Sequence, residues 1–179
     1  MNIDTEDGPV VVRNEPTYSF ASRDNVRSYK HEVRLKDSSL TSIHGVSLNG
    51  DDVVIVGAAG GCSTVHARSA VAINDLLYLA VGDHVACLSL TSPHPLIWSM
   101  QVDAATCFGI YWVPERSVLI SHGELEVSCL LPNGTLLWQT SGADIFTEGL
   151  SLLPSHIEVM DFNKSLYRLD YVTGEVLGC

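Results

Sequence analysis

A repeat of about forty residues is the feature that most constrains what this chain can fold into. Three segments align without gaps, at residues 77–98, 117–138 and 157–178. Sequence periods of about 20–50 residues are typical of proteins in which one small unit is stacked several times. The columns that match at this constant offset are Leu79 with Leu119 and Val159, Ile97 with Leu137 and Leu177, Trp98 with Trp138, and Gly109 with Gly149.

Each copy has the pattern of short strands joined by turns. In the last copy, residues 157–160 predict a strand, residues 161–164 (DFNK) a turn, and residues 166–171 a strand with period-two alternation. Thr173 with Gly174, and Asn133 with Gly134 in the middle copy, are hairpin signals. A further strand is expected before each copy, at residues 69–73, 108–113 and 149–153. Four short antiparallel strands per forty residues are typical of a β-propeller blade, and the matched tryptophans, Trp98 and Trp138, are expected to be buried at equivalent positions.

These segments also resemble a known family. Residues 166–177 (LYRLDYVTGEVL) are similar to the quinoprotein-type (PQQ-like) propeller repeat, whose blades contain Leu-Tyr-Ala-Leu-Asp, Thr-Gly and a tryptophan. Residues 130–138 (LLPNGTLLW) are similar to its second half, and residues 86–98 are a looser copy. The resemblance covers roughly residues 69–179 and implies a fold but no chemistry, since such repeats occur in quinone dehydrogenases and in scaffolds that bind only proteins. No residues match the quinone site of the enzymes, so no cofactor is expected.

We therefore predict an all-β fold of antiparallel four-stranded blades that form a small or incomplete β-propeller, with an open β-sandwich as the alternative. The 179 residues are expected to form a single domain without a long helix. Residues 69–102, 103–142 and 143–179 are the blade-like repeats, and residues 41–68 are a degenerate first blade. Residues 1–40 are expected to be irregular, apart from a possible edge strand. Whether the blades close on themselves or through a homodimer is left open.

The chain is acidic, with 10 lysines and arginines against 21 aspartates and glutamates and a formal net charge of -11. Nucleic-acid binding requires a basic surface that displaces counterions from the phosphates. DNA, RNA and anionic membranes are therefore excluded as partners, and a basic protein is favoured.

Five cysteines are widely spaced and form no C-x-x-C pair: Cys62, Cys87, Cys107, Cys129 and Cys179. We expect reduced thiols without a catalytic role, as in a cytosolic protein. Residues 1–8 carry acidic groups where a signal peptide is basic, and no apolar run approaches the ~20 residues of a membrane span. The expected location is the cytoplasm.

One face of the predicted propeller collects most of the chemically interesting residues. In a propeller, the turns between the second and third strands of the blades share a face with the connections between blades. No H-E-x-x-H or G-x-S-x-G motif is present, so no catalytic or metal-ligating residue is assigned. The turns carry Asp83, His84, His122, Glu124 and Asp161, and the connections carry Asp103, Thr106, Asp144, Thr147 and Glu148.

Two functions are compatible with this face. The first is a non-catalytic protein-binding module, similar in charge and size to immunity proteins and adaptors, that binds a basic protein through its acidic residues. The alternative is a small-ligand-binding or metal-binding protein, or a hydrolase, that uses His84, His122 and the neighbouring acids. Salt-dependent partner binding favours the first function, and a metal ion or ligand retained on purification favours the second.

Overall fold

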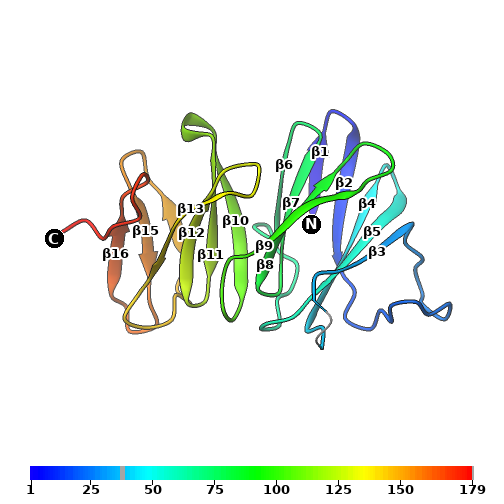
Figure 1. Ribbon diagram of the computed structural model, residues 1–179, viewed down its shortest axis with the longest axis horizontal. Coiled ribbons are helices and arrows are strands. Elements are labelled where there is room, and N and C mark those ends of the chain that lie inside the picture. Colours follow the sequence, from blue (N-terminus) through cyan, green and yellow to red (C-terminus); the bar gives the residue numbers. More distant parts are fainter. Residues whose placement is uncertain (37–38, 179) are drawn as a thin grey trace.

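The structure is a computed structural model that describes residues 1–36 and 39–178. Over these residues sixteen strands form four sheets, and the one helical segment is a short 3-10 turn, η1 (Pro114–Arg116). The prediction of an all-β fold is confirmed. The sheets follow one another in chain order along the long axis of the molecule (Figure 1). No helix in this part of the chain is both long and apolar enough to cross a membrane.

The second and third sheets are regular four-stranded blades. Their strands are rich in valine, leucine and isoleucine, and each strand pairs antiparallel with the next along the chain. Both sheets lie within the predicted blades at residues 69–102 and 103–142. The second sheet contains β6 (Ala70–Ile73), β7 (Leu76–Val81), β8 (His84–Ser89) and β9 (Leu96–Gln101), and the third contains β10 (Cys107–Val113), β11 (Val118–Gly123), β12 (Glu126–Leu130) and β13 (Leu136–Ser141).

The fourth sheet is a shorter version of the same unit. It consists of β14 (Leu150–Leu152), β15 (Ile157–Met160) and β16 (Leu166–Leu169), paired antiparallel. An isolated bridge joins Leu169 to Val176 along the other edge of β16, where a regular blade has its fourth strand. The described residues of the repeat at 143–179 thus form three strands and the start of a fourth.

The first sheet departs from the expectation that residues 1–40 are irregular and residues 41–68 form a degenerate blade. Three of its strands, β1 (Asn2–Thr5), β2 (Gly8–Asn14) and β3 (His31–Arg34), come from the first of these intervals. The other two are β4 (Ser42–Leu48) and β5 (Asp51–Ala58), and the spatial order is β1-β2-β4-β5-β3. The strands β1, β2, β4 and β5 make an antiparallel blade, whereas β3 pairs in parallel with β5 at the outer edge. Residues 15–41 are therefore an insertion within the first blade.

Apolar side chains fill the spaces between neighbouring sheets. Because alternate residues of a strand point to opposite faces, β7 directs Leu77 and Leu79 to the first sheet and Tyr78 and Ala80 to the third. A separate apolar cluster joins the third sheet to the fourth. The sheets are thus held together by face-to-face packing, as in the blades of a propeller.

The outer faces of the first and fourth sheets, at the two ends of the stack, are covered differently. At the first sheet, Tyr18 and Tyr29 of the insertion cover Ile43 and Ile55 on the outer face. At the fourth sheet, the side chain of Arg168 donates a 3.0 Å hydrogen bond to Glu158 on the outer face. The same face carries the apolar pair Met160 and Leu166, and Leu166 is 47% exposed. The first and fourth sheets lie at opposite ends of the row, so the described residues form an open, incomplete propeller-like stack (Figure 1).

Candidate functional site: an acidic groove on one rim

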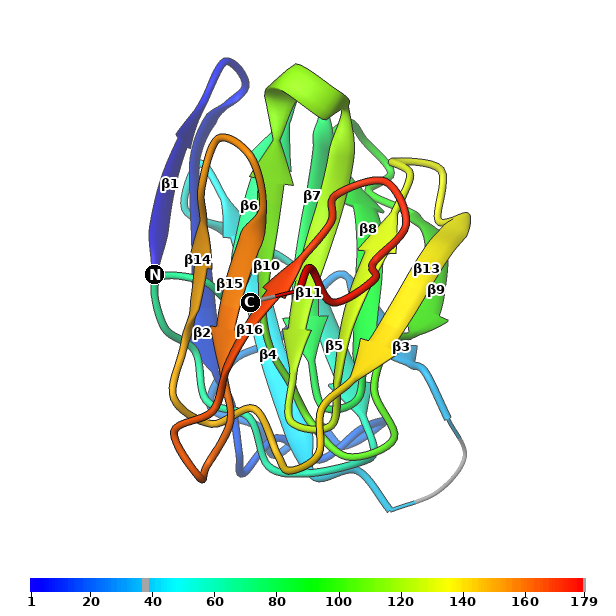
Figure 2. The same cartoon turned by 90° about the vertical axis from the view of Figure 1, so that its left-hand side faces the viewer.

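One rim of the stack carries the turns between the second and third strands of the blades together with the connections between blades. We call it the connection rim; it comprises residues 59–61, 82–84, 102–106, 122–126, 142–149 and 161–165, along the lower edge of the stack (Figures 1 and 2). Backbone hydrogen bonds tie its segments together. The N–H of Glu124 donates to the carbonyl of Thr106 at 2.8 Å, that of Phe146 donates to Glu124 at 2.6 Å, and that of Phe162 donates to Ile145 at 2.8 Å. All ten residues that the sequence placed on an acidic face lie along this rim.

Asp103 is a buried structural residue of the connection rim, with 2% of its surface exposed. Its carboxylate accepts four backbone N–H groups, from Ala105 (2.6 Å), Thr106 (3.1 Å), Leu125 (2.8 Å) and Glu126 (2.9 Å). Burial raises the pKa of this carboxyl group, against the four N–H groups, which stabilise its charged form. Asp103 therefore joins the β9–β10 connection, in which it lies, to the β11–β12 turn. Its carboxylate oxygens are already occupied by these contacts.

Asp83 and Asp161 hold turns of the second and fourth sheets, and both are buried. The carboxylate of Asp83 accepts a hydrogen bond from Lys36 Nζ at 3.0 Å. The carboxylate of Asp161 accepts the backbone N–H of Ser165 at 2.8 Å and the hydroxyl of Tyr167 at 3.0 Å. These contacts occupy both carboxylates within the fold.

The two imidazoles of the rim are buried beside different partners. Nδ1 of His84 lies 2.6 Å from the carboxylate of Asp83, and Nε2 of His122 lies 3.0 Å from the carbonyl oxygen of Phe146. Burial lowers the pKa of His122 to about 4, so this ring is neutral at pH 7. Among residues 1–36 and 39–178, no three His, Cys, Asp or Glu side chains are grouped as metal ligands would be.

The accessible acidic groups of the rim lie toward the third and fourth sheets. Glu124 is half-buried and accepts a 2.9 Å hydrogen bond from the hydroxyl of Thr106. Glu148 is exposed and forms an ion pair with Lys164. Asp144 is half-buried and faces a hollow of the surface. The predicted face therefore keeps four residues with accessible side chains, which are Glu124, Asp144, Thr147 and Glu148.

Two adjoining hollows, of about 430 and 180 Å³, lie on this part of the rim and share Ala104 and Glu126. We call them together the rim groove. Carboxylates, amides and the hydroxyl of Ser141 supply its polar groups, and no lysine, arginine or histidine of the described chain lines it. Lys36 lies at its edge, where its Nζ donates a 3.1 Å hydrogen bond to Gln101. Its main lining residues are Gln101, Asp103, Ala104, Leu125, Glu126, Gln139, Asp144 and Ile145.

Glu126 is the charged residue common to both hollows. Its carboxylate accepts a 2.6 Å hydrogen bond from the side-chain amide of Gln139, which also donates to the carbonyl of Val102 at 2.9 Å. Burial and, to a smaller extent, the charge of Asp103 raise the pKa of Glu126. Glu126 is partly exposed and lies next to another carboxylate, so a cation that enters the groove is attracted to it.

Sequence reasoning selected Asp144 but missed Glu126, Gln101 and Gln139. The three lie within strands, where polar side chains are expected on any exposed face and do not by themselves indicate a position at the rim. In the structure Glu126 begins β12 opposite Ser141. That register follows from the length of the β12–β13 turn, and a shift of one residue would have turned the side chain to the other face.

Comparisons with known proteins support the architecture. No protein-family model and no curated protein sequence matches this chain. A europium-containing methanol dehydrogenase is similar over 62% of this chain and 23% of its own, with a TM-score of 0.50 and 18% identity. The computationally designed Ika8 protein is similar over 80% of this chain and 46% of its own (TM-score 0.54, 12% identity), and designed Ika4 over 66% and 76% (TM-score 0.51, 12% identity). The chain thus spans about a quarter of the dehydrogenase. At these identities the likeness shows the fold alone, in agreement with the propeller-type repeat.

Proposed function

We propose that this chain is a non-catalytic protein-binding module whose rim groove receives a lysine or arginine side chain of a basic protein. The observation that carries the proposal is the groove itself, which combines two hollows, acidic and amide side chains, and no cation among its described lining residues. The net charge of -11 adds a long-range attraction for a basic partner.

The chemistry of the groove suits a long basic side chain. Glu126 and Asp144 offer carboxylate oxygens, and the exposed amide of Gln139 offers a further acceptor. The oxygens of Asp144 also accept the N–H of Ile145 and the side-chain amide of Asn163, and the Gln101 oxygen is already bound by Lys36 Nζ at 3.1 Å. The apolar stem of a lysine or arginine can pack on side chains such as Leu125 while its charged end meets these oxygens. Accessible charges of this kind mainly increase the association rate and make binding dependent on salt.

A defined peptide tests the proposal. The probe is a decapeptide of alternating arginine and glycine, with a citrulline-glycine peptide of equal length as its uncharged counterpart. Titration followed by NMR is expected to shift the amide signals of Ala104, Leu125 and Ile145 with the arginine peptide only. The double variant E126Q/D144N is expected to weaken binding about tenfold or more and to flatten its salt dependence, since each substitution removes a charged acceptor.

A matched control separates the groove from general attraction. The double variant E6Q/D24N changes the net charge by the same amount at exposed positions outside the groove. If both double variants lose the same affinity, net charge alone drives binding and the groove is not the site. Asp103 is left unchanged in this test because its carboxylate holds the rim together.

A further inference from the structure

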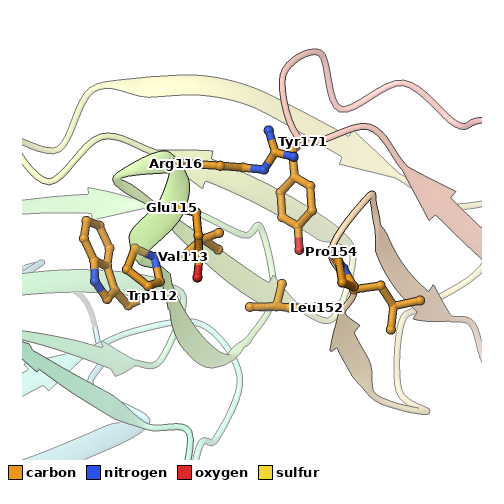
Figure 3. A pocket seen from close by; sticks show the side chains of 9 residues that line it. Trp112, Val113, Glu115, Arg116, Leu152, Pro154 and Tyr171 are labelled. Carbon is orange, nitrogen blue, oxygen red and sulfur yellow. Dashed lines mark hydrogen bonds between the residues drawn. The ribbon is translucent and has the colours of Figure 1, made fainter.

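A larger hollow, of about 540 Å³, lies on the opposite rim between the third and fourth sheets (Figure 3). It is bordered by the β10–β11 turn with η1, by the β14–β15 turn, and by Tyr171 after β16. Val113, Leu152 and Pro154 give it an apolar lining, whereas the side chain of Trp112 packs toward the second sheet, on the other face of β10. The volume falls within the roughly 300–1,000 Å³ of small-molecule sites.

One wall of the hollow is held firmly. Tyr171 is 5% exposed, and its hydroxyl donates a 2.9 Å hydrogen bond to the carbonyl oxygen of Leu153 on the facing turn. Its own carbonyl accepts a 2.9 Å hydrogen bond from the indole nitrogen of Trp138. The ring is thus fixed from both ends. A site whose walls are already ordered loses little entropy when a ligand binds.

Arg116 lies over this wall with its hydrogen-bonding capacity unused. The guanidinium carbon is 4.4 Å from the centre of the Tyr171 ring. A cation–π contact of this kind does not use up the N–H donors of the guanidinium group, so these can still bind an acceptor. In the described part of the chain, Arg116 takes part in no ion pair.

Glu115 lines the same hollow beside Arg116. It too is exposed, and within residues 1–36 and 39–178 it forms no ion pair. The hollow therefore presents one negative and one positive group next to an apolar lining. A simple anion would be repelled by Glu115, and a simple cation would be repelled by Arg116. An uncharged apolar molecule would leave both charged groups without a partner.

We propose that this hollow binds an amino acid with a large apolar side chain. Arg116 binds the α-carboxylate through two N–H groups, and Glu115 accepts hydrogen bonds from the α-ammonium group. The apolar side chain lies against Val113, Leu152 and Pro154 and is shielded from water there. This zwitterion is the ligand class that satisfies both charges and the apolar lining together, and its binding does not depend on the rim groove.

Calorimetric titration with L-phenylalanine and three analogues tests the ligand class. N-acetyl-L-phenylalanine lacks the ammonium group, L-phenylalaninamide lacks the carboxylate, and glycine lacks the apolar side chain. Each analogue is expected to bind about tenfold or more weakly than phenylalanine, since each loses a charged hydrogen bond or the apolar contact. Absence of phenylalanine binding, or equal binding of either blocked analogue, overturns the proposal.

Two variants test the residues. R116Q is expected to bind phenylalanine and phenylalaninamide with similar affinity, and E115Q is expected to do the same for phenylalanine and its N-acetyl form. R23Q and E6Q remove the same charges at exposed positions outside the hollow and are expected to keep the wild-type preferences. If R116Q and E115Q also keep those preferences, the assignment is wrong. The variant E126Q/D144N is expected to bind phenylalanine normally, so failure of the rim groove and failure of this site are distinguishable.

Discussion

The indole nitrogen of Trp98 lies 3.0 Å from the carbonyl oxygen of Pro132, in the hairpin turn of the following sheet. Trp138 repeats the contact one blade later, with its indole nitrogen 2.9 Å from the carbonyl oxygen of Tyr171. The matched tryptophans of the sequence repeat are therefore contacts between blades. Their equivalence was predicted correctly, but only Trp138 is buried, at 8% exposure, whereas Trp98 is half-buried.

A glycine in each turn makes room for the indole. A Cβ atom at Gly134 would lie 2.8 Å from the ring of Trp98, and a Cβ atom at Gly174 would lie 2.5 Å from that of Trp138. Both glycines also have a positive φ, of 88° and 71°. The two glycines that mark the hairpin turns in the sequence therefore also form the contact surface for the tryptophan of the preceding blade.

Removal of these tryptophans is expected to weaken the stack. W138A should lower the free energy of unfolding by about 3–5 kcal/mol, as for other buried aromatic side chains. W138F should lower it by about 1 kcal/mol through loss of the hydrogen bond, with most packing kept. W98A is expected to cost less than W138A because Trp98 is more exposed. Urea denaturation at pH 7 measures all three, and a W138A protein as stable as wild type would contradict the contact.

Asp103 offers a sharper test of the connection rim. D103N replaces one carboxylate oxygen by an N–H₂ group, so two of the four backbone N–H groups lose their acceptor. We expect the free energy of unfolding to fall by about 2–4 kcal/mol, since these groups are buried or partly buried. D144N, on the same rim, removes the acceptor of one hydrogen bond, from the N–H of Ile145 or the side-chain amide of Asn163, and is expected to cost about 1 kcal/mol. Equal stability of the two variants would show that Asp103 is not structural.

Two buried histidines predict a pH dependence of stability. Burial lowers the pKa of His44 and of His122 to about 4, against about 6.5 in an unfolded chain. Between these values the unfolded chain binds protons that the folded chain does not, so stability is lost as the pH falls from about 6.5 to about 4. Each histidine is expected to contribute on the order of 3 kcal/mol to this loss.

The histidine variants give the measurement its control. H122Q is expected to show a flatter dependence of the urea midpoint on pH between 7 and 4.5, whereas H31Q, at an exposed position, should follow the wild type. Carboxyl groups with lowered pKa, such as Glu158, act below this window, since their unfolded values are near 4. If the urea midpoint of H122Q depends on pH as steeply as that of the wild type, then the pKa of His122 in the folded wild-type protein is not lowered.

Thiol reactivity separates the cysteines. Cys87, Cys107 and Cys129 are free and buried, and burial raises their pKa values to about 12, 12 and 11. Cys62 is free and exposed, and Cys179 lies outside the described residues. In a C179S background, a thiol reagent at pH 8 is expected to label Cys62 rapidly and the other three only after unfolding. Rapid labelling of all four thiols in the native protein would contradict this.

The sequence predicted the regular sheets because their information is local. Within the second sheet and within the third, each strand pairs with its chain neighbour through a short turn, so the repeat and the hairpin signals at Asn133 and Gly134 were sufficient. The first sheet could not be predicted in this way. Its β3 pairs in parallel with β5, a strand that starts 17 residues after β3 ends, and β1 (NIDT) has little apolar alternation.

The ten residues selected from the sequence lie along one rim, but their contacts and most of the groove residues could not be predicted. Acidic residues in turns suggest a charged surface, yet the carboxylate of Asp103 is buried among backbone N–H groups of two separate segments. That role depends on the contact between a blade connection and the turn of the next blade. The groove residue Glu126 depends on strand register in the same way. The burial of Asp103 and the groove position of Glu126 both depend on tertiary contacts, so neither can be predicted from the neighbouring sequence.

The insertion between β2 and β4 sets the order in which the chain can fold. Strands of the middle sheets meet through turns of a few residues, whereas β2 reaches β4 only after residues 15–41. By loop-closure entropy, that step costs about 2 kcal/mol more than closing a two-residue turn. The parallel partner β3 must then find β5, a non-local pairing of the kind that slows folding. We therefore expect the second and third sheets to form the folding nucleus. The first sheet, although it is synthesised first, then acquires its structure last, by packing against sheets formed from later residues.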